Sequence, residues 1–272
     1  MPENPIPATG SSLLARLRDR QPCYALGIRT ARSVDFVRMA ATSGYDTIWI
    51  DLEHSTISLD TVSQMAATAR DLGMEPWARV PEGDFGVIGR ILDGGVTGLI
   101  VPQIETADDA RKAASYCRYP PEGGRSQNAL TSTFGFRRMP GRERVEAANS
   151  AVVLQVLLET REAIDNVEEI AAVEGVDIIG LGLNDLSSHL GILGDVRSET
   201  ITALCRKVIA AGRRLGKPVV IGGLAGPEHY AELVGLGAAP YVFAAIDTDL
   251  FVDILDQRIS RWRNVTSEKS TT

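Results

Sequence analysis

The sequence predicts a single-domain α/β protein folded as a (β/α)8 barrel, the TIM-barrel architecture. Strand-like and helix-like segments alternate eight times along the 272 residues, several strand-like segments are apolar on both faces, and no linker divides the chain. Continuously apolar strands are typical of a parallel sheet that helices cover from outside. A doubly wound open sheet is the alternative, but no Gly-x-Gly-x-x-Gly motif follows the first strand.

The predicted strands are short apolar runs of about the usual length for a strand. They cover residues 23–28, 45–50, 75–80, 98–101, 151–158, 176–181, 218–221 and 241–246.

The helical segments between these strands carry apolar residues three and four positions apart, as at Val34, Val37 and Ala41. Gly73 follows one segment at the position where helices commonly end. The expected helices cover residues 33–43, 58–72, 85–92, 107–116, 162–171, 198–215, 227–236 and 248–262. Residues 119–150 break the alternation, and we expect a long functional loop there without regular structure.

The ends of the chain are expected to lie outside the barrel. Residues 1–22 predict a flexible start with a short helix capped by Ser11 or Ser12, residues 23–264 the barrel, and residues 265–272 a polar tail.

Composition narrows the class of protein. With 44% hydrophobic and 23% charged residues, the chain can bury a sizeable core. The net charge of −7 argues against nucleic acid or an anionic membrane as the main partner. No apolar run approaches the roughly 18 residues needed to span a bilayer, and the start does not read as a signal peptide. The expectation is a cytoplasmic protein whose scattered Cys23, Cys117 and Cys205 are buried free thiols.

Polar side chains gather where the predicted strands end, and in a barrel these ends form one rim. The set is Asp51, Glu53, His54, Arg79, Gln103, Glu105, Glu159, Asn184, Asp185 and Asp247. A rim rich in carboxylates predicts a divalent-metal site completed by water and substrate oxygens. An arginine that ends an apolar strand, as Arg79 does, predicts an anionic partner.

Each residue of this set also has a simpler explanation. A single strand-end carboxylate more often caps a helix, and Glu159 and Asp185 both precede helical stretches. His54 alone would be a structural histidine, and His189 and His229 are expected in surface or packing positions. The residues by themselves therefore predict metal-assisted chemistry on a small acid and no more.

Several longer motifs carry a family resemblance. They are Ile50-Asp51-Leu52-Glu53-His54, Ala78-Arg79-Val80-Pro81, Leu92-Asp93-Gly94-Gly95, Arg118-Tyr119-Pro120-Pro121 with Gly124-Arg125, Leu158-Glu159-Thr160-Arg161-Glu162-Ala163, and Gly182-Leu183-Asn184-Asp185-Leu186-Ser187. With these motifs in matching order from about residue 27 to residue 251, the chain resembles the HpcH/HpaI family of metal-dependent pyruvate aldolases, typified by 2,4-dihydroxyhept-2-ene-1,7-dioate aldolase. The resemblance implies the same barrel, in a hexamer whose last helix packs across a subunit boundary.

The resemblance also implies roles for individual residues. Glu159 and Asp185 match the ligands of Mg²⁺ or Mn²⁺, and Arg79 matches the residue that stabilises the enolate of a 2-oxo acid. His54, oriented by Asp51, is expected to act as acid and base, with Asp93 reaching it from a neighbouring subunit.

The remaining expected substrate contacts come from the same motifs. The backbone amides around Leu183, Asn184 and Asp185 would receive the substrate carboxylate, and Arg125 and the position of Leu157 are expected to contact substrate.

Two stretches could supply the metal glutamate. Gln103-Ile104-Glu105-Thr106 spells the family's metal-strand motif, but it follows the fourth strand. The resemblance places the counterpart after the fifth strand, so the ligand role is assigned to Glu159 and not to Glu105.

The chain departs from the family pattern at three positions. Leu157 replaces a glutamine whose amide touches substrate oxygens, which a leucine cannot do. Ser126 replaces a common glycine, and Arg29 stands where an aromatic residue is common.

The predicted activity is metal-dependent cleavage of a 4-hydroxy-2-oxo acid to pyruvate and an aldehyde through a stabilised enolate. One alternative is oxaloacetate decarboxylation or enolate coupling, as in macrophomate synthase, which resembles this family. Another is a barrel that has lost turnover because of Leu157 and Ser126. The loop 127–140, with Phe134, Phe136, Arg137 and Arg138, is expected to select the aldehyde half together with another subunit.

Overall fold

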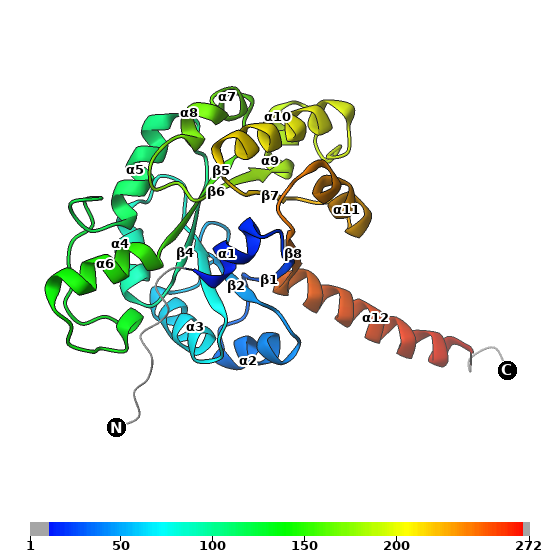
Figure 1. The fold of residues 1–272 in the computed structure, drawn as a ribbon. Helices are drawn as coiled ribbons and strands as arrows, with labels where there is room; N and C mark the ends of the chain where they lie inside the picture. The colour runs from blue at the N-terminus through cyan, green and yellow to red at the C-terminus, as the bar shows by residue number, and fades with distance from the viewer. Residues whose placement is uncertain (1–10, 269–272) are drawn as a thin grey trace.

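A computed structural model describes residues 11–268 of the chain, which form the barrel shown in Figure 1. Within these residues eight parallel strands follow one another around a nearly closed barrel, in the order β7-β6-β5-β4-β3-β2-β1-β8. The strands are β1 (Cys23–Ile28), β2 (Thr47–Asp51), β3 (Glu75–Arg79), β4 (Gly98–Val101), β5 (Val153–Leu158), β6 (Ile178–Gly182), β7 (Val219–Gly222) and β8 (Tyr241–Ile246). The predicted fold class is confirmed, because neighbours in sequence pair in register as parallel strands and no switch in strand order occurs in the described sheet.

Most of the helices lie outside the strands and cover them, but α12 points away from the barrel and α1 packs on its interior side chains (Figure 1). They are α1 (Ser12–Arg18), α2 (Val34–Thr42), α3 (Leu59–Asp71), α4 (Gly86–Asp93), α5 (Ala107–Cys117), α6 (Gly141–Ala151), α7 (Arg161–Asp165), α8 (Val167–Ala171), α9 (Leu183–His189), α10 (Glu199–Leu215), α11 (Pro227–Leu236) and α12 (Asp247–Glu268). Side-chain caps fix several starts: Ser11 accepts from the backbone of Leu14, and Ser58 from that of Thr61.

Three elements differ from the sequence-based expectation. The segment 119–150 is not irregular throughout, because it contains the 3₁₀ turn η1 (Ser132–Phe134) and helix α6. The expected helix over 162–171 is interrupted at Asn166, where α7 ends and α8 begins. Residues 183–189, where no helix was predicted, form α9. α7 and α8 have five residues each and α9 has seven, and helices this short leave little periodic pattern in a sequence.

Two apolar layers stabilise the barrel. One lies between the strands and the outer helices, and the other fills the barrel itself with inward side chains such as Trp49 and Trp77. The glycines beside these rings leave them room: a Cβ added at Gly98 would lie 2.3 Å from the Trp77 ring. Cys23, Cys117 and Cys205 are buried free thiols, as expected, and burial raises the pKa of Cys117 to about 12.

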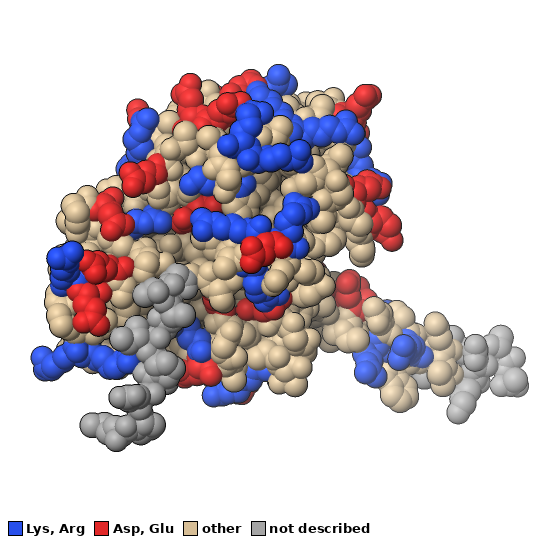
Figure 2. Space-filling view, viewed as in Figure 1, with Lys and Arg blue, Asp and Glu red and all other residues tan. Residues whose placement is uncertain are grey.

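Helix α12 points away from the rest of the molecule (Figure 1). Much of its surface carries neither acidic nor basic residues in Figure 2. Its exposed large apolar side chains are Leu250, Phe251, Val252, Ile254, Leu255, Ile259, Trp262 and Val265. No described helix is long and apolar enough to cross a membrane. The expected flexible residues 1–10 and the end of the expected polar tail, 269–272, lie outside the described residues.

Candidate active site

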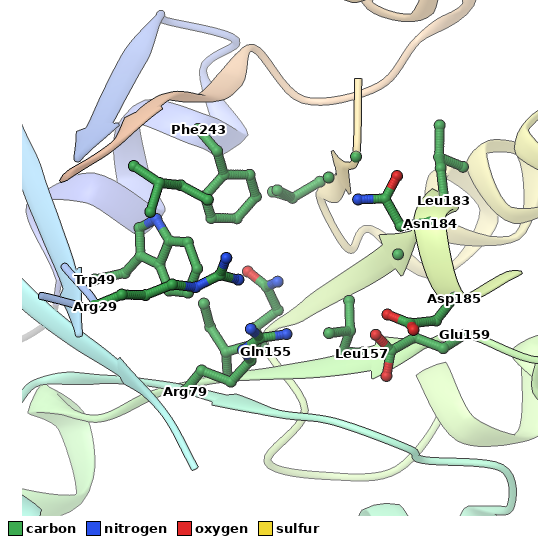
Figure 3. A pocket seen from close by; sticks show the side chains of 16 residues that line it. Arg29, Trp49, Arg79, Gln155, Leu157, Glu159, Leu183, Asn184, Asp185 and Phe243 are labelled. Carbon is green, nitrogen blue, oxygen red and sulfur yellow. The ribbon is translucent and has the colours of Figure 1, made fainter. Parts of the chain in front are cut away.

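A pocket of about 140 Å³ opens at the carboxyl ends of the strands (Figure 3). Its lining comes from strands on all sides of the barrel and from the turns that follow them. The lining residues are Arg29, Trp49, Arg79, Ile100, Gln155, Leu157, Glu159, Gly182, Leu183, Asn184, Asp185, Val220, Gly222, Gly223, Phe243 and Ile246. The structure therefore brings six of the predicted site residues into one cavity: Arg79, Leu157, Glu159, Leu183, Asn184 and Asp185.

At the ends of β2 and β3, the carboxylates of Asp51 and Glu53 form ion pairs with the guanidinium groups beside the pocket. The Arg79 guanidinium donates to both carboxylate oxygens of the fully buried Asp51, through Nε at 3.0 Å and Nη2 at 2.6 Å. Burial alone would raise the pKa of Asp51, but the hydrogen bonds and charges of Arg79 and Arg29 outweigh it and lower this pKa. Asp51 is therefore ionised and holds both arginines in place.

Glu53 joins the same cluster. Its Oε2 lies 2.9 Å from Arg79 Nη1 and 3.9 Å from His54 Nε2. Burial raises the pKa of Glu53, while the nearby Arg79 and His54 oppose the rise. Glu53 was expected only as one of the rim carboxylates, and it lies between Arg79 and His54.

Glu159 and Asp185 form the other side of the pocket, and their carboxylates lie side by side in Figure 3. Glu159 is buried at the end of β5, where its Oε2 accepts the backbone N–H of Gln103 at 3.2 Å. Burial raises the pKa of Glu159 to about 8, against the Gln103 hydrogen bond, and the negative charges of Asp185 and Glu53 add to the rise. This side of the pocket thus brings carboxylates together, and the charge of Arg79 offsets their repulsion only in part.

The backbone beside Asp185 is open to the pocket. Leu183, Asn184 and Asp185 occupy the first turn of α9, where backbone N–H groups have no partner within the helix. Gly223 has a φ of +77°, and a Cβ there would lie 3.0 Å from the amide nitrogen of Asn184. A glycine at this turn keeps that amide accessible.

His54 does not line the pocket, and its side chain is 55% exposed. Asp51 accepts the backbone N–H of His54 at 3.3 Å, but no side-chain hydrogen bond joins the two residues in the described structure. The expected orientation of the imidazole by Asp51 is therefore not seen, because the carboxylate already binds Arg29 and Arg79.

Asp93 and Arg125 lie together away from this pocket. Arg125 Nη2 is 2.5 Å from Asp93 Oδ1, and the Arg125 guanidinium lies 4.5 Å from the centre of the Tyr119 ring. Neither residue lines the pocket of its own chain, nor do the residues of the loop 127–140. A contact of these residues with substrate would have to come from a neighbouring copy.

Glu105 has a structural position. Its Oε1 accepts a hydrogen bond from Thr160 Oγ1 at 2.8 Å, and Thr160 caps α7. Glu105 does not line the pocket, whereas Glu159 does. Of these two carboxylates, only that of Glu159 is in a position to contact a ligand in the pocket.

Comparison with known proteins identifies the family. The family model for HpcH/HpaI aldolase/citrate lyase matches residues 30–253. This chain belongs to the HpcH/HpaI aldolase/citrate lyase family. It is an enzyme, a lyase.

Relatives of this HpcH/HpaI chain include several aldolases. It is 39% identical to the 4-hydroxy-4-methyl-2-oxoglutarate aldolase tasA of Hapsidospora irregularis, over 74% of this chain and 76% of that protein. It is 32% identical to the 2-keto-3-deoxy-L-rhamnonate aldolase of Shigella sonnei, over 92% of each chain. The solved structure of an HpcH/HpaI aldolase/citrate lyase family protein from Burkholderia cenocepacia J2315 is 31% identical, with a TM-score of 0.81 over 93% of this chain and 99% of that one.

Among the residues that sequence reasoning did not place in the pocket of this HpcH/HpaI enzyme, two carry polar side chains, Arg29 and Gln155. Arg29 was noted only as a departure from the family pattern, and Gln155 was not noted at all. Successive side chains of a strand point to opposite faces, so Gln155, Leu157 and Glu159 all point into the barrel. This alternation was the available signal, and it puts an amide one inward position deeper than Leu157.

Proposed function

We propose that this enzyme is a divalent-metal-dependent pyruvate aldolase that cleaves a 4-hydroxy-2-oxo acid to pyruvate and an aldehyde. The observation that carries the proposal is the pair Glu159 and Asp185, set across one small pocket from the arginine Arg79. A paired carboxylate site and a nearby cation suit a 2-oxo acid whose enolate needs stabilisation. The aldolase relatives named above support the same reaction class.

The donor set fits a hard divalent cation. Glu159 is buried beside two other carboxylates, and its pKa is raised for that reason. A divalent ion would remove this repulsion, and Mg²⁺ and Mn²⁺ both prefer carboxylate and water oxygens. Within the described residues no third His, Cys, Asp or Glu completes such a site, which leaves positions for water and substrate. When bound, the ion would polarise the carboxylate and keto oxygens of the 2-oxo acid.

Arg79 has the capacity to bind a developing oxyanion. Three of its nitrogens are fixed by Asp51 and Glu53, and a guanidinium has five N–H donors, so two remain. Asp51 holds the group rigidly, so little reorganisation is needed when charge develops. The N–H groups of Leu183, Asn184 and Asp185 would receive the substrate carboxylate.

Cleavage breaks the bond between C3 and C4 of the substrate. The electron pair of that bond forms the enolate, the 4-hydroxyl loses its proton, and C4 becomes the carbonyl carbon of the aldehyde. A proton then adds to C3 to give pyruvate. We assign the proton transfers to His54, with Glu53 between it and Arg79, and we infer that Asp93 of a neighbouring copy approaches His54.

Exchange of deuterium into the methyl group of pyruvate tests this proposal, because it requires the enolate and no aldehyde. We expect exchange that depends on Mg²⁺ or Mn²⁺ and that Glu159→Ala and Asp185→Ala abolish. His54→Ala should slow cleavage far more than it weakens metal binding. Absence of metal-dependent exchange would contradict the proposal, and unchanged metal affinity in both carboxylate variants would favour a barrel without turnover.

A second candidate is oxaloacetate decarboxylation or coupling of its enolate. It is favoured by the apolar wall that Leu157 forms with Val220, Phe243 and Ile246, because an apolar wall offers no hydrogen bond to an aldehyde oxygen. Oxaloacetate separates the candidates: CO₂ release much faster than cleavage of 4-hydroxy-2-oxo acids would favour the second.

We also propose that the enzyme assembles into a homo-oligomer, a hexamer of paired copies, through α12. The helix leaves the molecule with its apolar side chains uncovered; Trp262 is 70% exposed. Contiguous exposed apolar side chains commonly mark interaction sites. On the body, Ala244 of β8 and Tyr24 of β1 are also exposed, where a barrel helix would normally cover the strands. Sedimentation of the wild type and of Leu255→Glu/Trp262→Glu tests this: the variant should be monomeric, and a monomeric wild type would contradict the proposal.

A further inference from the structure

Arg29 is held rigidly at the rim of the pocket. It follows the last residue of β1, and the backbone N–H groups of Arg29, Thr30 and Ala31 donate to the carboxylate of Asp247 at 2.8, 2.9 and 2.6 Å. Asp247 is fully buried at the start of α12. Three hydrogen bonds to one buried carboxylate fix this turn, so the base of the Arg29 side chain is preorganised.

The Arg29 guanidinium is only partly used by the protein. Its Nε donates to Asp51 Oδ2 at 2.6 Å, and its central carbon lies 6.0 Å from the centre of the Trp49 ring. Neither terminal nitrogen has an acceptor in the described part of the chain, which leaves four N–H donors. The side chain is 28% exposed and lines the pocket. Arg79 differs, because both of its terminal nitrogens already contact carboxylates.

The surroundings of Arg29 indicate a polar ligand at this end of the pocket. Figure 3 shows Arg29 on the side opposite Glu159 and Asp185, with Gln155 and Leu157 between them. Gln155 is 1% exposed, and its Oε1 has no hydrogen-bond partner among the described residues. A buried polar atom without a partner needs explanation, and a ligand or water beside it supplies one.

We propose that Arg29 binds a second carboxylate, on the half of the substrate that leaves as the carbonyl product, so that the preferred substrates are dicarboxylic 4-hydroxy-2-oxo acids. This inference rests on the proposed function for the placement of the first carboxylate near Asp185. The two terminal nitrogens of a guanidinium match the two oxygens of a planar carboxylate. A neutral leaving half would leave these donors unpaired, and sites built for a polar group reject analogues that lack it.

Binding of two inert 2-oxo acids tests the proposal without any turnover. 2-Oxoglutarate and 2-oxopentanoate have the same chain length, but the first ends in a carboxylate and the second in a methyl group. Calorimetry with Mg²⁺ present should show 2-oxoglutarate binding at least tenfold tighter to the wild type. Arg29→Gln should remove most of this preference and Arg29→Lys only part of it, because a lysine keeps the charge but lacks the paired N–H donors of a guanidinium. Arg38→Gln, which removes an exposed guanidinium from α2, is the matched control and should keep the preference.

Cleavage gives the second readout. For 4-hydroxy-2-oxoglutarate, Arg29→Gln should lower kcat/KM by about 10²-fold, mainly through KM; for 4-hydroxy-2-oxopentanoate the loss should be several times smaller. Equal losses for both substrates would overturn the proposal and make Arg29 a residue that only positions Arg79 through Asp51. A wild type without any preference for 2-oxoglutarate would also overturn it. If the binding preference exists and depends on Arg29 but pyruvate shows no exchange, the carboxylate subsite stands and the aldolase proposal fails.

Discussion

The two sides of the pocket treat charge in opposite ways. Where β2 and β3 end, Asp51 is paired with two guanidinium groups and its pKa is lowered. Where β5 and β6 end, Glu159 lies near Asp185 and Glu53 and its pKa rises to about 8. The first side is complete within one chain, whereas the second becomes favourable only when a cation or protons are added. This difference indicates that Asp51 keeps Arg29 and Arg79 in place before any ligand binds, whereas the Glu159 side requires a bound cation or protons.

The largest effect is expected from breaking the complete side. Arg79→Ala would leave Asp51 with one guanidinium and Glu53 with none, and loss of one partner of a buried ion pair costs about 3–5 kcal/mol. Urea unfolding measures this change. Arg38→Ala, on an exposed pair, should change the free energy of unfolding by less than about 0.5 kcal/mol. A similar small change for Arg79→Ala would show that Asp51 does not depend on it.

Removing the carboxylate of Glu159 should instead increase the free energy of unfolding of the metal-free protein. Because the pKa of Glu159 is raised, the folded metal-free protein holds this proton while the unfolded chain releases it, so stability falls as pH rises from about 4.5 to about 8. Metal-free Glu159→Gln should lack this loss and be about 2–4 kcal/mol more stable than the wild type at pH 8.5. Mg²⁺ should stabilise only the wild type. The same pH dependence of stability in both proteins would show that the pKa of Glu159 is not raised in the folded state.

Leu157 lies between the two sides of the pocket. Its replacement tests whether this position contacts the leaving half of the substrate. Leu157→Gln would place an amide one inward position above Gln155 on β5. We expect the ratio of kcat/KM for 4-hydroxy-2-oxo acid cleavage to that for oxaloacetate decarboxylation to change by about tenfold, the effect of roughly one hydrogen bond. Metal affinity should remain within a factor of two. An unchanged ratio would mean that Leu157 does not contact the leaving half.

The smallest effect is expected at Thr160, directly after Glu159. Thr160 caps α7 and also donates to Glu105, so Thr160→Ala should cost about 1 kcal/mol. The loss should be the same with and without Mg²⁺, because the cap does not depend on the carboxylate of Glu159. A loss that appears only with Mg²⁺ would show that the cap and the carboxylates of Glu159 and Asp185 are energetically coupled.

Local patterns were sufficient for most of the barrel. The apolar run of β2 and the start of α3 at its cap Ser58 could be predicted, because both patterns depend only on residues close together in the chain. α9 was missed because its seven residues, with Asn184 and Asp185 near the start, carry no long periodic pattern. The carboxyl-end positions of Arg79, Glu159 and Asp185 followed from the fold, since parallel strands bring their ends to one rim.

The sequence by itself determined the fold class, the rim on which the site lies and the family to which the enzyme belongs. Only the tertiary structure decided which partner each charge takes: Asp51 binds Arg29 and Arg79 and not the imidazole of His54, and Arg125 binds Asp93 outside the pocket. The physical reason is that strand periodicity fixes direction along one segment, whereas ion pairing depends on distances between segments that are far apart in the chain. For the same reason Arg29 and Gln155 become recognisable as pocket residues only when β1 and β5 face each other across the barrel.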